Sequence, residues 1–156
     1  MLKQKIKKLF ANEYSGHDYW HSIRVLNTAE KISKTEECNE YIVMIAALLH
    51  DTDDIKIFET TDYENARRIM SECLLTEDTI DQVIDIIKEI SFKGTDTTSP
   101  KSIEGKIVQD ADRLDAMGAI GIARAFAYGG NHNRAIHIPD CYYRFGTIFF
   151  RIKIIM

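Results

Sequence analysis

The stretch that decides the fold is "YIVMIAALLHDTDD", residues 41–54. The eight residues before its histidine carry no charge, so a helix over them is apolar on every side, which is typical of a buried helix. The run then ends in His50 and Asp51, and Asp53 and Asp54 follow at once. A buried carboxylate without a partner is costly. The sequence therefore predicts that a partner, such as a metal ion, meets the end of this helix.

The composition is that of an ordinary globular domain. The chain has 156 residues, of which 45% are hydrophobic and 28% charged, and this length fits one domain with its own core. A formal net charge of -4 argues against a strongly basic nucleic-acid binder, so no nucleic-acid partner is expected.

Cysteine usage and the N-terminus point to a reducing compartment. Cys38, Cys73 and Cys141 form no CxxC motif, so we expect free thiols. The opening "MLKQKIKKLF" lacks the apolar core of a secretory signal, and no apolar run is long enough to span a bilayer. The sequence predicts a cytoplasmic protein with no membrane partner.

The hydrophobic period is helical nearly throughout, and no strand pattern or internal repeat occurs. The first predicted helix covers residues 2–10. The later helices are each preceded by residues suited to start a helix: Asp18, Asn39, Thr61 with Glu64, Thr76, and Ser99 with Pro100. Small residues at 118–127 permit close helix contact, and 129–140 is predicted as a loop. The fold class is all-α, in one domain.

A second cluster of potential ligands lies in "GHDYWHSIRV", residues 16–25. His17 and His21 are four residues apart and could share one helical face. Asp18 between them is also a good N-cap residue, which would explain it without any metal.

A third cluster lies in "VQDADRLDA", residues 108–116. Asp112 and Asp115 lie on one flank of the apolar stripe of this predicted helix, and Asp110 lies on the other. Either flank could reach a buried metal, so the spacing alone does not choose between them. Taken singly, each cluster is explained as well by capping or by a solvated face. Together, imidazoles and carboxylates beside apolar helices favour Mn²⁺, Fe²⁺, Co²⁺ or Zn²⁺, or Mg²⁺ where imidazoles are fewer.

The ordered pattern resembles the HD superfamily of metal-dependent phosphohydrolases. It is carried by His21 in "HSIRV", by His50 and Asp51 in "LLHD", and by Asp112 in "DADRLDA". The resemblance covers about Leu2 to Asp140 and includes "GHDYWH", "EGKIVQDADRLDAMGAIGIARAF" and "YGGNHNR". It is similar to a small bacterial branch that includes nucleotide pyrophosphohydrolases.

The resemblance implies a helical bundle that holds one divalent ion, Mn²⁺, Fe²⁺, Co²⁺, Mg²⁺ or Zn²⁺, in its core. The implied ligands are His21, His50, Asp51 and Asp112. Asp54 matches a position that activates or orients the attacking water. Residues expected to orient the ligands are His17, Asp18, Asp110 and Asp115. The cations expected to meet substrate phosphate are Arg24, Lys56 and Lys93.

The function expected from these residues is hydrolysis of a phosphoester or pyrophosphate bond, with a small phosphorylated substrate such as a nucleotide. The alternative is an HD-fold sensor that binds metal and nucleotide without significant turnover. A third hypothesis, a helical interaction module, needs no metal at all.

The last sixteen residues, "CYYRFGTIFFRIKIIM", fit none of these patterns. The resemblance implies further helices that close the bundle after "YGGNHNR", and the tail does not match them. We therefore divide the chain into an HD domain, residues 1–140, and an atypical tail, residues 141–156. Because aromatic and β-branched side chains in water promote association, a homo-oligomer is an expected state.

Overall fold

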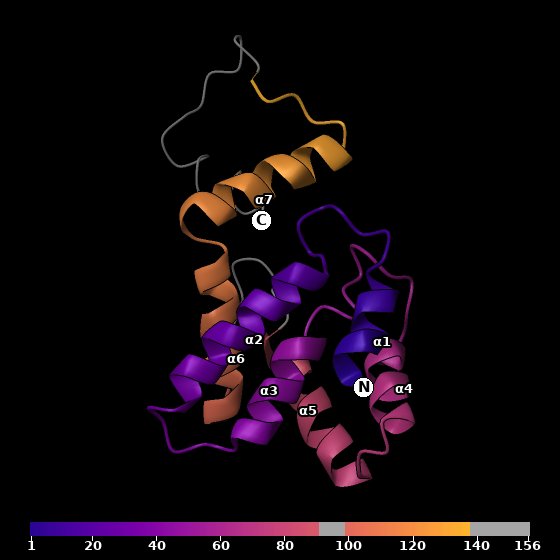
Figure 1. Cartoon of the computed structure of the whole chain (residues 1–156), viewed down its shortest axis with the longest axis vertical. Coiled ribbons are helices and arrows are strands. Elements are labelled where there is room, and N and C mark those ends of the chain that lie inside the picture. Colours follow the sequence, from indigo (N-terminus) through magenta and orange to yellow (C-terminus); the bar gives the residue numbers. More distant parts are fainter. Residues whose placement is uncertain (91–98, 138–156) are drawn as a thin grey trace.

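Seven α-helices make up the part of the chain that the computed structural model describes, residues 1–90 and 99–137 (Figure 1). In chain order they are α1 (Leu2–Leu9), α2 (Tyr19–Ser33), α3 (Glu40–Leu49), α4 (Glu64–Glu72), α5 (Glu77–Ile90), α6 (Ile103–Asp115) and α7 (Gly118–Asn131). No strand occurs in these ranges, which confirms the all-α prediction. Every helix within them is too short or too polar to traverse a lipid bilayer.

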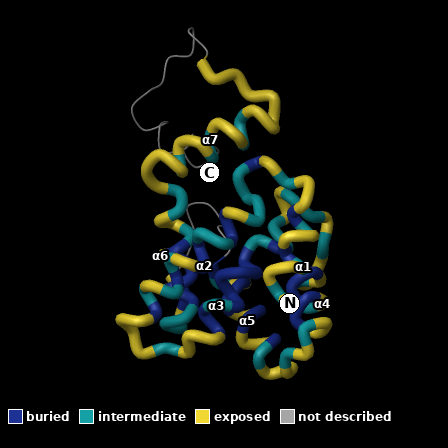
Figure 2. The backbone as a smooth tube through the Cα atoms, viewed as in Figure 1, coloured by how far each residue is buried: buried dark blue, intermediate teal, exposed yellow. Residues whose placement is uncertain are grey.

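The core forms around α3. Seven of its ten residues are buried, as expected for a helix without charge between its first residues and its end. Helices α2 and α5 pack against α3, and α6 packs against all three. Most of the buried residues lie in these four helices, and the others lie largely in α1 and α4 (Figure 2). Each fully buried Val, Leu or Ile contributes about 1.5–3 kcal/mol, so this core holds the ends of α2, α3 and α6 in fixed relative positions.

Helices α1 and α4 cover another side of the bundle. Helix α1 contacts α3 and α4, and α4 contacts α5. Ile6 and Phe10, on the predicted apolar face of the first helix, are buried. Cys38 and Cys73 are free thiols, whereas Cys141, the whole tail 141–156 and Lys93 lie outside the described residues.

The caps of the first helices differ in how well local sequence predicts them. Asp18 accepts a hydrogen bond from the amide of His21 (2.8 Å), and Asn39 accepts one from the amide of Ile42 (3.3 Å), as predicted. The predicted cap at Thr61 is wrong, because α4 begins at Glu64 without a local side-chain cap.

The cap of α4 comes instead from the α3–α4 loop, residues 50–63. The two carboxylate oxygens of Asp53 accept hydrogen bonds from the amides of Asn65 (2.9 Å) and Ala66 (2.8 Å). The side chain of Asn65 donates in return to the carbonyl of Thr52 (2.9 Å). A carboxylate at a helix N-terminus is also favoured by the helix dipole. These bonds fix the α3–α4 loop to α4.

The start of α6 is three residues later than predicted. Ser102, and not Ser99, caps the helix by accepting from the amide of Gly105 (3.0 Å). A Cβ atom built on Gly105 would lie 2.8 Å from the Cβ atom of Pro100. Pro100 therefore packs over the first turn of α6 and does not enter the helix.

Helix α7 lies beyond the end of the bundle and follows α6 after a short turn (Figure 1). None of its residues is buried. The close contact expected from its small residues occurs at Gly121, where a Cβ atom would lie 2.1 Å from the carbonyl oxygen of Ala116. The helix continues to Asn131, so the predicted loop at 129–140 begins too early.

Candidate metal centre

The first element of the site is the N-terminal turn of α2. Asp18 caps the helix through the amide of His21, so the cap sets the position of the first turn. His21 then points into the bundle and its side chain is 0% exposed. His17 precedes the helix and donates from Nδ1 to the carboxylate of Asp51 (2.9 Å). The sequence "HDYWH" thus places one imidazole in the core and one at its edge.

The second element is the end of α3. His50 is the C-cap residue of α3, still with helical backbone angles, and it is buried. Its Nδ1 atom lies 2.9 Å from the carbonyl oxygen of Ala47. Since a carbonyl only accepts, Nδ1 carries the hydrogen and Nε2 faces the bundle interior. Asp51 follows in the chain and lies beside the same imidazole.

The third element is the last turn of α6, which supplies Asp112 and Asp115. Asp115 accepts a hydrogen bond from Nδ1 of His21 (2.8 Å). The tautomer of His21 is therefore fixed as well, with Nε2 toward the interior. Asp110 is exposed on α6, and the structure does not bring it to the cluster. We predicted that Asp110 orients a metal ligand. It does not contact one, because it lies on the opposite flank of α6 from Asp112.

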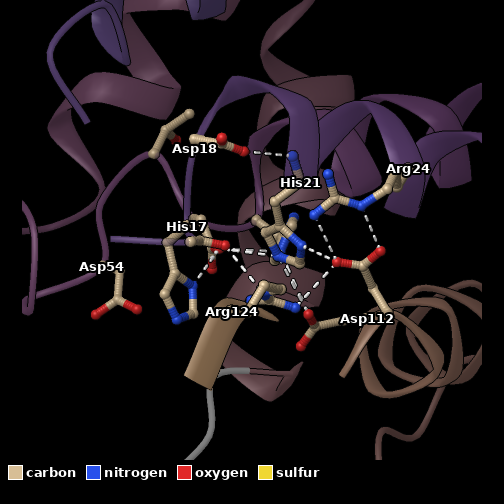
Figure 3. A network of polar contacts seen from close by, with 12 residues as sticks. His17, Asp18, His21, Arg24, Asp54, Asp112 and Arg124 are labelled. Atoms are coloured by element: carbon tan, nitrogen blue, oxygen red, sulfur yellow. Dashed lines mark hydrogen bonds and ion pairs between the residues drawn. The ribbon is translucent and has the colours of Figure 1, made fainter. Parts of the chain in front are cut away.

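Four ligand atoms from these elements converge (Figure 3). His21 Nε2 lies 3.1 Å from His50 Nε2, 3.2 Å from Asp51 Oδ2 and 3.3 Å from Asp112 Oδ1. His50 Nε2 lies 3.3 Å from the Asp51 oxygen and 3.8 Å from the Asp112 oxygen. With metal–ligand bonds of about 2.1 Å, neighbouring ligand atoms lie about 3.0 Å apart in an octahedron and about 3.4 Å apart in a tetrahedron. The spacing fits a single metal ion.

The chemistry of the donor set points the same way. Both imidazoles already donate their Nδ1 hydrogens elsewhere, so two Nε2 atoms and two carboxylate oxygens face one another and a cation is required among them. Within the described residues, two overlapping groups can hold a metal ion: His17, His21 and Asp51, and His21, His50 and Asp112. The side chain of Asp112 is 38% exposed, so the cluster is closed on the α2 and α3 side and open beside Asp112.

The pKa values in the metal-free protein reflect the same need for positive charge. Burial lowers the pKa of His21, but hydrogen bonds with Asp112, Asp115 and Asp51 outweigh burial and raise it to about 10. Burial also lowers the pKa of His50, and the charge of Asp51 outweighs it and raises the pKa. The surrounding carboxylates thus favour positive charge at this point, which is the charge that a bound cation would supply.

Asp115 is the centre of a second network around His21. Its side chain is 7% exposed and accepts from Nε and Nη2 of Arg24 (2.7 and 3.0 Å) and from Nη1 of Arg124 (3.0 Å). Burial raises the pKa of Asp115, but the hydrogen bonds from His21 and Arg24 outweigh it and hold the pKa well below its usual range. A charged carboxylate therefore stays on the imidazole of His21. Arg24 was predicted to meet phosphate, and the structure pairs it with Asp115 instead.

The α3–α4 loop places Asp54 and Lys56 near the cluster without joining them to it. Asp54 accepts from the amide of Lys56 (2.9 Å), and the ammonium group of Lys56 lies 4.0 Å from its other oxygen. The Asp54 carboxylate is 17% exposed. Figure 3 draws it on the His17 side of the cluster, with no bond to the other residues shown.

Comparison with known proteins identifies this arrangement. Residues 19–117 match the model of the HD domain, and this range contains all four converging side chains.

The chain belongs to the HD family.

Known proteins and solved structures are similar to this chain over most of its length. Protein YpgQ of Bacillus subtilis is 39% identical in an alignment of 145 positions, and the match covers 87% of this chain and 68% of YpgQ. The crystal structure of YpgQ in complex with ADP has a TM-score of 0.72 at 35% identity, covering 89% of this chain and 69% of that one. A Bacillus thuringiensis HD-superfamily hydrolase has a TM-score of 0.67 at 38% identity, covering 90% of this chain and 69% of that one. This chain thus has the fold of the HD-superfamily hydrolases.

Two residues of this HD domain escaped prediction. Asp53 was seen as one more carboxylate after the HD dipeptide, and its role as the cap of α4 depends on amides more than ten residues away. Arg124 is the single charged residue among the small residues of "GIARAF". Nothing else in that stretch predicts that it belongs to the site. Its bonds to Asp115 and to the carbonyl of Gly16 (2.9 Å) follow from the placement of α7.

Proposed function

We propose that this HD protein is a divalent-metal-dependent phosphohydrolase that cleaves a phosphoester or pyrophosphate bond of a nucleotide. The convergence of His21, His50, Asp51 and Asp112 on one point supports it best. Two carboxylates and two neutral imidazoles neutralise one divalent ion and leave coordination positions for other ligands. When bound, the ion supplies Lewis acidity that activates water and polarises a phosphoryl oxygen.

The residues around the ligands hold them in place. His17 donates to the carboxylate of Asp51, and Asp115 accepts from His21. Such partners fix the orientation of the ligating groups, and the Asp115 carboxylate also raises the basicity of His21. Asp18 acts one step further out, because its cap on the amide of His21 fixes the turn that carries this imidazole.

Asp54 takes the role of accepting or relaying the proton of the attacking water. It follows Asp51 by three residues, and the α3–α4 loop that carries it is anchored to α4 through Asp53. One of its oxygens is held by the amide of Lys56, which fixes the orientation of the carboxylate that would act as the general base. Of the cations predicted to meet substrate phosphate, Lys56 remains a candidate, and its side chain is 36% exposed. Lys93 also remains a candidate but lies outside the described residues.

The nucleotide is proposed because YpgQ, a relative of this chain, has been crystallised in complex with ADP. Nothing in the four ligands themselves selects a nucleotide over another phosphate compound. The substrate part of the proposal therefore depends on the comparison, and the metal part depends on the geometry.

A screen of nucleoside mono-, di- and triphosphates tests the proposal. Release of phosphate and of pyrophosphate is measured separately, with Mn²⁺, Co²⁺ or Mg²⁺ added to chelator-treated protein. We expect metal-dependent release from at least one nucleotide, and none from His50→Ala, which lacks a ligand. Asp110→Ala, an exposed change on α6, serves as the matched control and keeps activity. Tight nucleotide binding without release under any metal would instead identify a sensor.

A further inference from the structure

A hollow lies next to the metal centre, between the loop before α2 and one side of α7. The volume open to the centre of a water molecule is about 30 Å³. Alanine and glycine residues form part of its wall, and the polar side chains that line it are Ser15, His17, Arg124 and Tyr128. The mechanism proposed above makes no use of this space.

His17 connects the hollow to the metal centre. Its Nδ1 atom donates to Asp51 Oδ2 (2.9 Å), and the same ring lines the hollow. A group in the hollow is therefore about one imidazole ring away from a ligand of the metal. Figure 3 shows His17 and Arg124 at the edge of the ligand cluster.

Arg124 gives the hollow a positive charge. Its side chain is 15% exposed, its Nε donates to the carbonyl of Gly16 (2.9 Å) and its Nη1 donates to Asp115 (3.0 Å). These bonds leave Nη2 with hydrogens to donate. Asp115 is shared by the guanidinium groups of Arg24 and Arg124, so Arg124 has no carboxylate partner of its own among these contacts. Buried guanidinium groups of this kind recognise phosphate.

The backbone around Arg124 keeps the hollow in this position. Gly16 has a φ of +99°, and a Cβ atom there would lie 3.3 Å from the Cα and Cβ atoms of Arg124. The loop before α2 thus approaches α7 as closely as a glycine allows. Gly121 lets the start of α7 lie against the end of α6 in the same way.

We infer that this hollow binds a second phosphate group of the substrate, next to the phosphate at the metal, with Arg124 and Tyr128 as hydrogen-bond donors. The substrate class that follows is a compound with two adjacent phosphates, such as a nucleoside di- or triphosphate, in preference to a phosphomonoester. This inference rests on the proposed function for the position of the first phosphate. The site in the hollow is argued from the residues of this chain alone.

Equilibrium binding to the Mn²⁺-loaded full chain, measured by calorimetry, tests the inference. The probes are inorganic phosphate, inorganic pyrophosphate and ADP, and ADP distinguishes a nucleotide ligand from free pyrophosphate. We expect pyrophosphate and ADP to bind at least about tenfold more tightly than phosphate, the effect of an additional hydrogen bond to a charged group.

Two variants locate this preference. Tyr128→Phe removes a hydroxyl and keeps the ring, and Arg124→Lys keeps the charge and removes the planar fork. We expect each to reduce the preference for pyrophosphate about tenfold. The matched controls are Tyr41→Phe and Arg113→Lys, both at exposed positions, and these retain the preference.

The metal content of each variant is measured in parallel, because Arg124 also contacts Asp115. A reduced preference in a variant with full metal content supports the hollow as a phosphate site. If Arg124→Lys loses metal, Tyr128→Phe decides alone. Equal binding of phosphate and pyrophosphate by the unaltered chain, or an unchanged preference in both variants, overturns the inference.

The outcome is separate from that of the proposed function. If pyrophosphate binding depends on Tyr128 and Arg124 but no nucleotide is hydrolysed, the phosphate site is supported and the proposed hydrolase activity is refuted. If a nucleotide is hydrolysed but phosphate and pyrophosphate bind equally well, the hydrolase activity is supported and the phosphate site in the hollow is refuted.

Discussion

Replacing Asp115 by asparagine tests whether the second network supports the metal centre. Oδ2 of Asp115 accepts from His21, Arg24 and Arg124, while Oδ1 accepts from Nε of Arg24. An asparagine oxygen in the place of Oδ2 keeps three of these contacts without the negative charge. Its amide nitrogen then faces the N–H group of Arg24, where two donors oppose each other.

The magnitude follows from burial. Removing one partner of a buried ion pair costs about 3–5 kcal/mol. The side chain of Arg24 is 35% exposed and that of Arg124 is 15% exposed, which places the change in the free energy of unfolding near the lower value, about 3 kcal/mol. For a domain of this size that lowers the melting temperature by about 6–12 °C. Because His21 also loses a charged orienting partner, the metal affinity falls about 10- to 100-fold.

Metal affinity is measured by competition with a chromophoric chelator, and stability by thermal unfolding of chelator-treated protein. Asp110→Asn makes the same chemical change five residues earlier on an exposed face of α6. It should alter stability by less than about 0.5 kcal/mol and leave the affinity unchanged. If Asp115→Asn binds metal as tightly as the unaltered chain, Asp115 does not orient His21 in any way that matters for the ion. If only stability falls, the network is structural.

Four further outcomes are expected. Removing the metal with a chelator should lower the melting temperature, because a ligand at 100 times its Kd stabilises the folded state by about 2.7 kcal/mol; equal melting curves with and without Mn²⁺ would contradict this. Asp54→Asn should retain metal by elemental analysis and lose about 10²- to 10⁴-fold in rate, and full activity would exclude the role of Asp54 in proton transfer. Asp53→Asn should cost about 1–3 kcal/mol, measured by urea unfolding, because asparagine keeps one acceptor oxygen and turns its amide nitrogen toward the second helix amide, which is left unpaired. Asp62→Asn, at a side chain that is 80% exposed, should cost little. Gly121→Ala should displace α7 and lower the melting temperature, since the new Cβ atom has no room, whereas Gly130→Ala has open space around it and should not.

The parts of the structure that sequence predicted are those that depend on neighbours in the chain. The uncharged run before His50 predicted a buried helix, and Asp18 and Asn39 predicted caps that the structure contains. Each of these features involves residues within one or two helical turns. The ligand set came from the resemblance to the HD superfamily, since spacing left both His17 and Asp110 open.

The parts that escaped depend on contacts between distant residues. The cap of α4 joins Asp53 to amides 12 and 13 residues away, and a nearer threonine offered a plausible local alternative. Arg124 reaches Gly16 across 108 residues and Asp115 across nine. The hydrophobic period of the sequence does not predict such a pairing, because the pairing forms only when α6 and α7 are packed in the folded chain.

These sequence separations also set the order in which the site forms during folding. His21 and Asp115 are 94 residues apart, so the imidazole gains its orienting partner only after the chain has closed nearly two thirds of its length into one loop. Closure of a long loop costs free energy that grows slowly with length, but contacts of such separation form late and slow the folding of the chain. Uptake of metal in a refolding experiment is therefore expected to coincide with the docking of α6, the helix that supplies Asp112.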